Sequence, residues 1–168
     1  LRLTPRPEIT ESLSAECLAD FGLPMVRGYE VADVEQLLDR AQSVTYPLVL
    51  KTAEVNISHK SDSNGVVLNI ESEQQLLRAY TDLKHRLGPK ALIAPMITEQ
   101  GVEMILGLNN DPQFGPIIVL GFGGLQAELL ADTVVLLAPF GEQTARRALE
   151  RLKMKPLLSG YRGQNKVN

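Results

Sequence analysis

The sequence has little cysteine and few aromatic residues. It contains one cysteine, Cys17, and no tryptophan, and aromatic residues make up 5% of its 168 residues. A single cysteine excludes an intramolecular disulfide framework and a zinc site built from clustered cysteines. It also fits a protein of the reducing cytoplasm, where we expect this chain to act. We interpret Cys17 as a residue of the core.

The sequence also lacks long apolar runs and clusters of positive charge. Its apolar stretches are shorter than the ~20 residues that a membrane-spanning helix needs, and its N-terminus has no signal-peptide pattern. The net charge of -3 argues against a general affinity for nucleic acids or anionic membranes. Hydrophobic residues make up 44% of the chain, enough for one domain or two small lobes. We therefore expect a globular protein without a nucleic-acid or membrane partner.

Helix and strand patterns alternate along the chain. Helix patterns cover residues 11–21, 33–44, 72–87 and 142–153. Capping boxes open two of them, at Asp33 with Gln36 and at Ser72 with Gln75. Strand patterns cover residues 25–30, 47–53, 66–70, 91–96, 102–108, 116–120 and 133–138, and residues 109–112 are expected to form a turn. This succession predicts an α+β fold with a mostly antiparallel sheet in its second half.

A polar loop with a histidine runs directly into the strand predicted at residues 66–70. His59 is flanked there by Lys60 and Asp62. Because the pKa of an imidazole lies near neutrality, such a residue can accept a phosphoryl group or shuttle a proton. The alternative interpretation is a surface histidine in a turn.

Two predicted strands carry a charged residue among apolar ones. Lys51 shares a strand face with Val49 and Ala53, so its ammonium either pairs with an anion such as phosphate or extends into solvent. Glu103 shares a face with Ile105, and a carboxylate that faces inward needs a partner: a metal, a ribose hydroxyl or Lys51. The alternative is that Glu103 lies at the solvent end of an edge strand.

Glycines and a pair of carboxylates follow the strand predicted at residues 116–120. Gly123 and Gly124 allow backbone N–H groups to approach phosphate oxygens closely, although the segment is neither a P-loop nor a dinucleotide fingerprint. Glu128 and Asp132 are four residues apart, which places both carboxylates on one side of a helix or a strand. Mg²⁺ is usually bound by one or two carboxylates with substrate phosphates. The pair is therefore a candidate magnesium site, or else two solvated acidic residues.

These motifs follow one another in an order that resembles a known family. The ordered segments are 46–51, 58–62 before Gly65 and Val66, 101–103, 111–116, 121–124 with Glu128 and Asp132, 138–139 and 160–163. Over residues 10–163 the series resembles the ATP-grasp domain of the NDP-forming acyl-CoA synthetases. That family includes ADP-forming acetyl-CoA synthetase and is related to the succinyl-CoA synthetase β subunit. One departure is Asn64, where the family usually has glycine; it either stiffens the loop or uses asparagine's tolerance of positive φ.

The resemblance implies two α+β lobes that grip ATP, and phosphoryl transfer through histidines. It implies that Lys51 contacts nucleotide phosphates and that His59 is transiently phosphorylated. The other implied site residues are Ala94, Pro95 and Met96 at a hinge that contacts adenine, Glu103, Gly123 and Gly124 for the nucleotide, and Glu128 and Asp132 for Mg²⁺. Phosphoryl transfer depends mainly on positioning and charge neutralisation, which lysine and a metal ion supply.

The sequence contains neither the CoA-binding domain nor the domain with the second phosphohistidine that the resemblance implies. We therefore expect an ATP-grasp domain at residues 11–163, with tails at 1–10 and 164–168, taken from a longer protein. The leading hypothesis is a ligase that converts ATP, a carboxylate and CoA into acyl-CoA, ADP and phosphate. The alternatives are a regulatory or scaffolding domain of a protein lysine acetyltransferase, and a decayed module that only dimerises. The chain is also a candidate for homo-oligomerisation.

Overall fold

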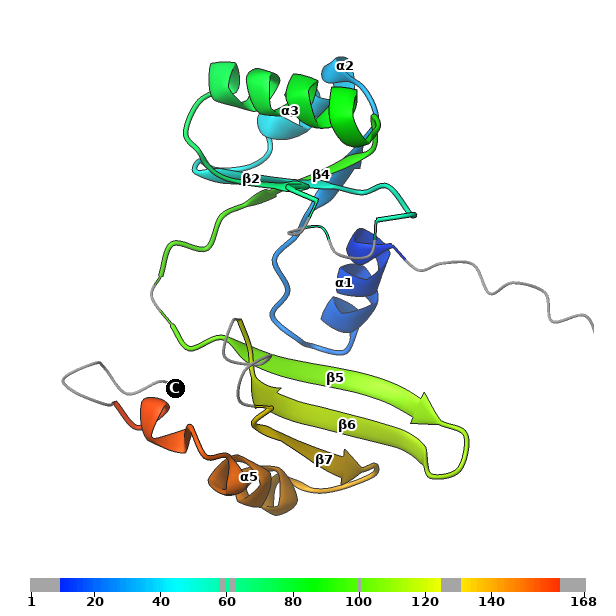
Figure 1. The fold of residues 1–168 in the computed structure, drawn as a ribbon, viewed down its shortest axis with the longest axis vertical. Coiled ribbons are helices and arrows are strands. Elements are labelled where there is room, and N and C mark those ends of the chain that lie inside the picture. The colour runs from blue at the N-terminus through cyan, green and yellow to red at the C-terminus, as the bar shows by residue number, and fades with distance from the viewer. Residues whose placement is uncertain (1–9, 58–59, 61–62, 100, 125–130, 161–168) are drawn as a thin grey trace, which may run out of the picture. The chain divides into compact units, whose positions relative to one another are not determined.

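The computed structural model divides into two compact units, Leu1–Thr98 and Glu99–Asn168. The structure describes residues 10–57, 60, 63–99, 101–124 and 131–160. Each unit combines helices with an antiparallel sheet (Figure 1), which confirms the prediction of two α+β lobes. Both predicted tails lie outside the described residues, apart from Thr10. No helix in the described part of the chain is both long enough and apolar enough to cross a membrane.

The first unit is built on a sheet of four strands. The strands are β1 (Tyr29–Val31), β2 (Leu48–Thr52), β3 (Val66–Ile70) and β4 (Ala91–Pro95), in the order β1-β4-β2-β3. All three strand pairs are antiparallel. The helices α2 (Val34–Ala41) and α3 (Glu73–Leu87) cover one face of the sheet, and α1 (Glu11–Asp20) lies on the other side (Figure 1).

The core of this unit lies between the sheet and the two covering helices. Alternate residues of β2, Leu48 and Leu50, point to that side and are fully buried, as is Ile93 of β4. From α3, Leu76 and Tyr80 complete the cluster one helical turn apart. Lys51 alternates with Leu48 and Leu50 along β2, so its side chain lies on the other face of the sheet, where it contacts Glu11 of α1.

The capping boxes predicted from the sequence are confirmed. Asp33 accepts a hydrogen bond from the backbone N–H of Gln36 at 2.8 Å, and Ser72 accepts one from Gln75 at 3.3 Å. In return, the Gln36 and Gln75 side chains accept hydrogen bonds from the backbone N–H groups of Ala32 and Glu71. The bonds to Asp33 and Ser72 satisfy one first-turn N–H group each in α2 and α3, and the reciprocal bonds hold the residue just before each N-cap.

The second unit is a three-stranded sheet with one covering helix. The strands β5 (Met104–Asp111), β6 (Gly115–Phe122) and β7 (Thr133–Leu137) are antiparallel and lie in chain order. Helix α5 (Glu142–Arg151) packs on one face and is followed by a short 3₁₀ helix, η1 (Lys155–Leu157) (Figure 1). The buried cluster of this unit contains Phe122, Val134, Ala148 and Leu152.

The prediction that Cys17 is a core residue is wrong. Helix α1 has no buried residue, Cys17 is exposed, and Phe21 next to the helix is 88% exposed. The apolar spacing predicted the helix correctly but not its contacts. The reason is that α1 meets the sheet through polar side chains of its first turn, Glu11 and Ser12.

The limits of several predicted strands also change, most clearly at two of them. The strand predicted at residues 25–30 begins only at Tyr29, and the strand predicted at 102–108 runs from Met104 to Asp111. The turn therefore moves from residues 109–112 to the segment between Asp111 and Gly115, which are cross-strand partners. The Asp111 carboxylate accepts hydrogen bonds from the backbone N–H groups of Gln113 and Phe114, at 2.8 and 2.9 Å, and these bonds stabilise the turn.

The inward orientation predicted for Glu103 is wrong as well. Glu103 is exposed and precedes β5, which is an edge strand. Its neighbours Val102 and Met104 are half-buried and pack on the core of the second unit. The alternation was therefore correct but the inward face was the other one, and the alternative of a solvent-exposed end of an edge strand applies.

Candidate functional site

Lys51 does not extend freely into solvent. It lies on β2, opposite Val66 of β3 and Leu92 of β4, on the sheet face that α2 and α3 leave uncovered. Its Nζ donates a hydrogen bond to Oε1 of Glu11 at 2.7 Å, and the Lys51 side chain is 32% exposed. Of the two outcomes expected for this ammonium, pairing with an anion applies, and the anion in this structure is a carboxylate of the chain itself.

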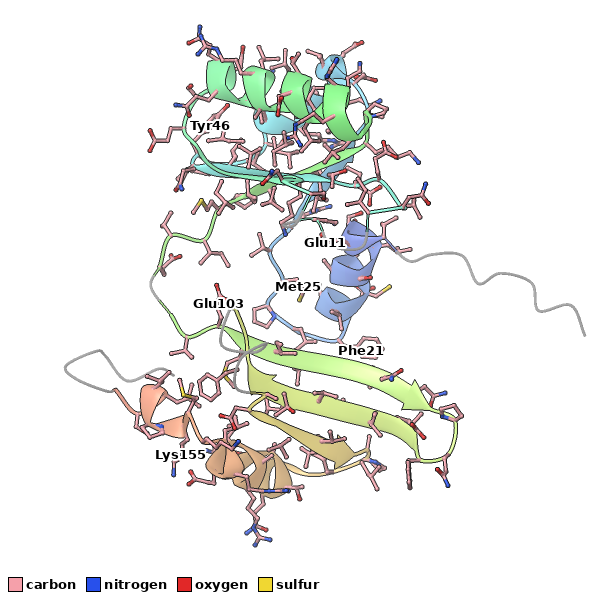
Figure 2. All side chains as sticks on the ribbon, in the orientation of Figure 1. Glu11, Phe21, Met25, Tyr46, Glu103 and Lys155 are labelled. Carbon is pink, nitrogen blue, oxygen red and sulfur yellow. The ribbon has the colours of Figure 1, made fainter. Side chains whose placement is uncertain are left out.

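A second lysine shares this carboxylate. Lys60 Nζ donates to Oε2 of Glu11, also at 2.7 Å, so each oxygen of Glu11 accepts from one ammonium. Figure 2 shows Glu11 in the first turn of α1, on the side of the helix that is close to the sheet. Burial on its own would raise the pKa of Glu11, but the hydrogen bonds and charges of Lys51 and Lys60 outweigh burial and lower it. The carboxylate is therefore ionised at neutral pH.

The loop that contains Lys60 is closed by several hydrogen bonds. The carbonyl of Lys60 accepts from the N–H of Gly65 at 2.6 Å and from the Ser63 hydroxyl at 3.2 Å. Arg86 of α3 donates to the carbonyls of Ser63 and Asn64 at 3.4 and 3.1 Å. Asn64 has a φ of 50°. Of the two explanations for asparagine at this position, the structure therefore agrees with its tolerance of positive φ.

Gly65 makes this closure possible. A Cβ atom at residue 65 would lie 2.7 Å from Cγ2 of Thr52 and 2.9 Å from the carbonyl oxygen of Lys60. Only glycine allows the loop to approach β2 this closely. The predicted phosphoryl carrier, His59, directly precedes Lys60 in the sequence and lies outside the described residues.

The predicted adenine hinge lies at the end of β4. Ala94 and Pro95 pair with Val49 and Leu48 of β2. Met96 follows the strand; its N–H donates to the carbonyl of Pro47 at 2.9 Å. The segment therefore belongs to the same sheet as Lys51, and it comes shortly before Thr98, where the first unit ends.

The other predicted nucleotide-binding residues meet in the second unit. The N–H of Gly123 donates to the carbonyl of Glu103 at 2.7 Å, which joins the end of β6 to the start of β5. Gly124 has φ of +64°, and a Cβ atom there would overlap the Glu103 carboxylate. The positive φ favours glycine at residue 124, whereas the Glu103 carboxylate is the end of an exposed, flexible side chain that can move aside. Glu103, labelled in Figure 2, is exposed.

Asp132 of the candidate magnesium pair is buried next to this group. Its two oxygens accept hydrogen bonds from the backbone N–H groups of Lys153 and Met154, at 2.9 and 2.8 Å. Burial favours a higher pKa for Asp132, but these two bonds and the charge of Lys153 outweigh it and lower the pKa. Asp132 thus joins the start of β7 to the segment after α5. Its predicted partner Glu128 lies outside the described residues.

The structure brings the predicted site residues together in two groups, one in each unit. Lys51 and the segment of Ala94 to Met96 share the sheet of the first unit, and Glu103, Gly123, Gly124 and Asp132 meet at one end of the sheet of the second unit. Within the described part of the chain, no three side chains of His, Cys, Asp or Glu form a ready metal site.

Sequence reasoning missed Glu11 and Arg86. Glu11 lies 40 residues before Lys51 and 49 before Lys60, and Arg86 lies more than 20 residues after the carbonyls it contacts. Acidic residues are common in the first turn of a helix because they interact favourably with the helix dipole. Glu11 at that position therefore did not indicate that it would pair with two lysines.

Comparison with known proteins agrees with this arrangement. A family model of the ATP-grasp domain matches residues 3–168. The beta subunit of acetate–CoA ligase (ADP-forming) II from Pyrococcus furiosus is 33% identical over 167 residues, covering 95% of this chain and 70% of that subunit. Acetate–CoA ligase (ADP-forming) I from Archaeoglobus fulgidus is 35% identical over 158 residues, covering 85% of this chain but only 23% of that enzyme.

Solved structures of a dinucleotide-forming acetyl-coenzyme A synthetase 1 from Ca. Korarchaeum cryptofilum are also similar. The complex with coenzyme A, Ca-AMPCP and HgCl+ has a TM-score of 0.82 and 31% identity, over 92% of this chain and 71% of that one. A complex with coenzyme A and Mg-AMPPCP, whose phosphohistidine segment points towards the nucleotide binding site, has a TM-score of 0.77 and 32% identity, over 92% of this chain and 68% of that one. With the family match over nearly its whole length, this chain belongs to the ATP-grasp family and has the ATP-grasp fold.

Proposed function

We propose that this chain is the nucleotide-binding, phosphoryl-transferring domain of an ADP-forming acid–CoA ligase. The observation that carries the proposal is the similarity to an ADP-forming acetate–CoA ligase subunit along 95% of the chain. The paired ammonium groups of Lys51 and Lys60 agree with it, since phosphoryl transfer requires positive charge at the phosphates. The lysine acetyltransferase alternative has no support among the relatives described above.

In the proposed reaction His59 carries the phosphoryl group. A neutral imidazole nitrogen attacks the γ-phosphorus of ATP, the N–P bond forms, and the bond between the γ-phosphorus and the β-γ bridging oxygen breaks. ADP leaves with the electron pair of that bond, and the other ring nitrogen loses its proton to solvent. Lys51 contacts the phosphates and stabilises the charge that develops on them. Lys60 directly follows His59 in the sequence. Its positive charge is therefore proposed to help stabilise the phosphorylated histidine.

The remaining site residues are proposed to bind the nucleotide. The backbone of Ala94, Pro95 and Met96 contacts adenine. Gly123 and Gly124, which lack side chains, let the backbone come close to phosphate oxygens, with the N–H of Gly123 held by the Glu103 carbonyl. The Glu103 carboxylate is proposed to accept a hydrogen bond from a ribose hydroxyl. These roles are supported by the position of Glu103, Gly123 and Gly124 close together at one end of the second unit's sheet.

Mg²⁺ is proposed to bind with the nucleotide at Glu128 and Asp132. Asp132 is an almost fully buried, ionised carboxylate, whose pKa is lowered by the N–H groups of Lys153 and Met154 and by the charge of Lys153. Both of its oxygens already accept one N–H, but a carboxylate oxygen has a second lone pair that can face a metal. Mg²⁺ would neutralise charge on the phosphates and orient them. The Mg-AMPPCP complex of the Korarchaeum protein supports this choice of ion.

The complete reaction needs more protein than this chain contains. The chain spans 23% of the Archaeoglobus enzyme, so CoA binding and the second phosphohistidine are proposed to come from other domains or subunits. The acyl group is then selected outside this chain. A cytoplasmic location is part of the proposal and is supported by the single cysteine.

The test is phosphorylation of His59. The chain is incubated with Mg²⁺ and ATP labelled in its γ-phosphate, and we expect a phosphoryl adduct that is labile in acid and stable in base. His59→Asn should abolish the adduct, and His85→Asn, which changes the only other histidine, should leave it intact. A chain that binds MgATP but forms no adduct at His59 would contradict the carrier role.

A further inference from the structure

The ion pairs of Glu11 join three separate parts of the first unit. Glu11 begins α1, Lys51 belongs to β2, and Lys60 belongs to the loop that precedes β3. Both ammonium groups lie 2.7 Å from a carboxylate oxygen, and the three side chains are 27–43% exposed. The trio is therefore accessible to a solute, and its net charge is one positive charge.

Other carboxylates near the trio already have partners. Glu30 accepts from the hydroxyl of Ser12 at 2.8 Å, and Glu54 accepts from the N–H of Lys90 at 2.9 Å. Both line a pocket of ≈ 310 Å³ that Glu11 and Lys60 also line. The pocket itself is therefore too acidic for an anion. The position that suits an anion is the one that the Glu11 carboxylate fills, with one ammonium at each of its oxygens.

A phosphoryl group fits the same position chemically. Like a carboxylate, it presents several oxygens that accept charge-assisted hydrogen bonds from ammonium groups, and it carries more negative charge. Beside Glu11 it would be repelled by the carboxylate, although the partial exposure of the trio screens this repulsion. A phosphoryl group that takes the same position between the two ammonium groups must displace the Glu11 carboxylate from it.

We propose that Lys51 and Lys60 together form a phosphoryl-binding position, and that Glu11 occupies it in the ligand-free chain as a built-in competitor. The inference rests on the proposed function for the phosphate contact of Lys51. It adds Lys60 as a second phosphoryl contact, and it makes binding depend on release of the first turn of α1. Binding of a phosphoryl group to Lys60 would then release Glu11 and so change the contacts of the first turn of α1.

The experiment measures binding of inorganic tripolyphosphate to the full chain by calorimetry at low salt. Glu11→Gln keeps the shape of the side chain and removes its charge, and it should tighten binding about fivefold, the range expected for loss of a partly exposed ion-pair competitor. Glu16→Gln is the matched control, since it removes the same charge from an exposed position of the same helix. It should change the affinity less than twofold.

The two lysines provide the second arm. Lys51→Met and Lys60→Met should each weaken tripolyphosphate binding by about fivefold or more, and Glu11→Gln should give no gain when Lys60 is also methionine. Unchanged or weaker binding by Glu11→Gln, or normal binding by Lys60→Met, would overturn the proposal. If Glu11→Gln does not fold, Glu11→Asp replaces it; the shorter side chain should give a smaller gain, and no gain would count against the proposal.

MgATP distinguishes this inference from the proposed function. If tripolyphosphate shows the expected pattern while MgATP does not bind, the phosphoryl position stands and the nucleotide-binding function fails. If MgATP binds and phosphorylates His59 while Glu11→Gln changes neither affinity, the function stands and Glu11 is not a competitor.

Discussion

Replacing Lys51 with methionine is expected to weaken MgATP binding by about ten- to a hundredfold. A hydrogen bond to a charged group contributes about 1.5–3 kcal/mol, and each 1.4 kcal/mol corresponds to about a factor of ten in affinity. Methionine keeps a long apolar side chain against the sheet next to Leu92, so the loss comes from the ammonium group. Isothermal titration of the chain with MgATP measures the effect.

Lys84→Met is the matched control for this variant. Lys84 is an exposed residue of α3, the helix on the opposite face of the same sheet, so the substitution makes an equal change in net charge. MgATP binding should stay within about twofold of the unmodified chain, as expected for a distant exposed charge. Equal affinities for the Lys51 and Lys84 variants would show that Lys51 pairs only with Glu11 and does not contact the nucleotide.

Replacing Tyr80 with alanine should have the largest effect on stability. Tyr80 is fully buried between α3 and the sheet of the first unit, and its hydroxyl donates to the carbonyl of Pro89 at 2.9 Å. Truncation of a large buried aromatic residue typically costs about 3–5 kcal/mol, out of the roughly 5–15 kcal/mol that stabilise a domain. The free energy of unfolding, from urea titration followed by circular dichroism, should fall by about this amount.

Tyr80→Phe separates packing from hydrogen bonding. It keeps the ring and removes only the hydroxyl, so about 1 kcal/mol should be lost, partly because the Pro89 carbonyl is left without this donor. If phenylalanine costs as much as alanine, packing of the ring is not what stabilises this unit and the assigned core is wrong.

Features of the fold that depend on nearby residues could be predicted from the sequence. The helix starts at Asp33 and Ser72 follow from side chains three residues apart, and both capping boxes are present. The limits of β1 and the turn after β5 were wrong, because they depend on cross-strand pairing. The pairing of Asp111 with Gly115 involves residues on both strands of the hairpin, which no local pattern specifies.

In the candidate site too, features set by nearby residues could be predicted and contacts between distant residues could not. Lys51, Gly123 and Gly124 could be named as candidates because a cation in a buried strand, or glycines after one, is unusual locally. The carboxylate that Lys51 contacts could not be predicted, because Glu11 is 40 residues away and on a helix whose exposed face was misjudged. The orientation of Glu103 was wrong for a related reason. Strand alternation defines two faces, and only the packing of Val102 and Met104 determines which of them is buried.

The most direct test of this account is a crystal structure of the chain with Mg²⁺ and a non-hydrolysable ATP analogue. We expect a phosphate oxygen of the analogue within hydrogen-bond distance of Lys51 Nζ, with the Glu11 carboxylate displaced from that ammonium. A bound analogue whose phosphates do not contact Lys51, with the Lys51–Glu11 ion pair intact at its present 2.7 Å, would contradict the account.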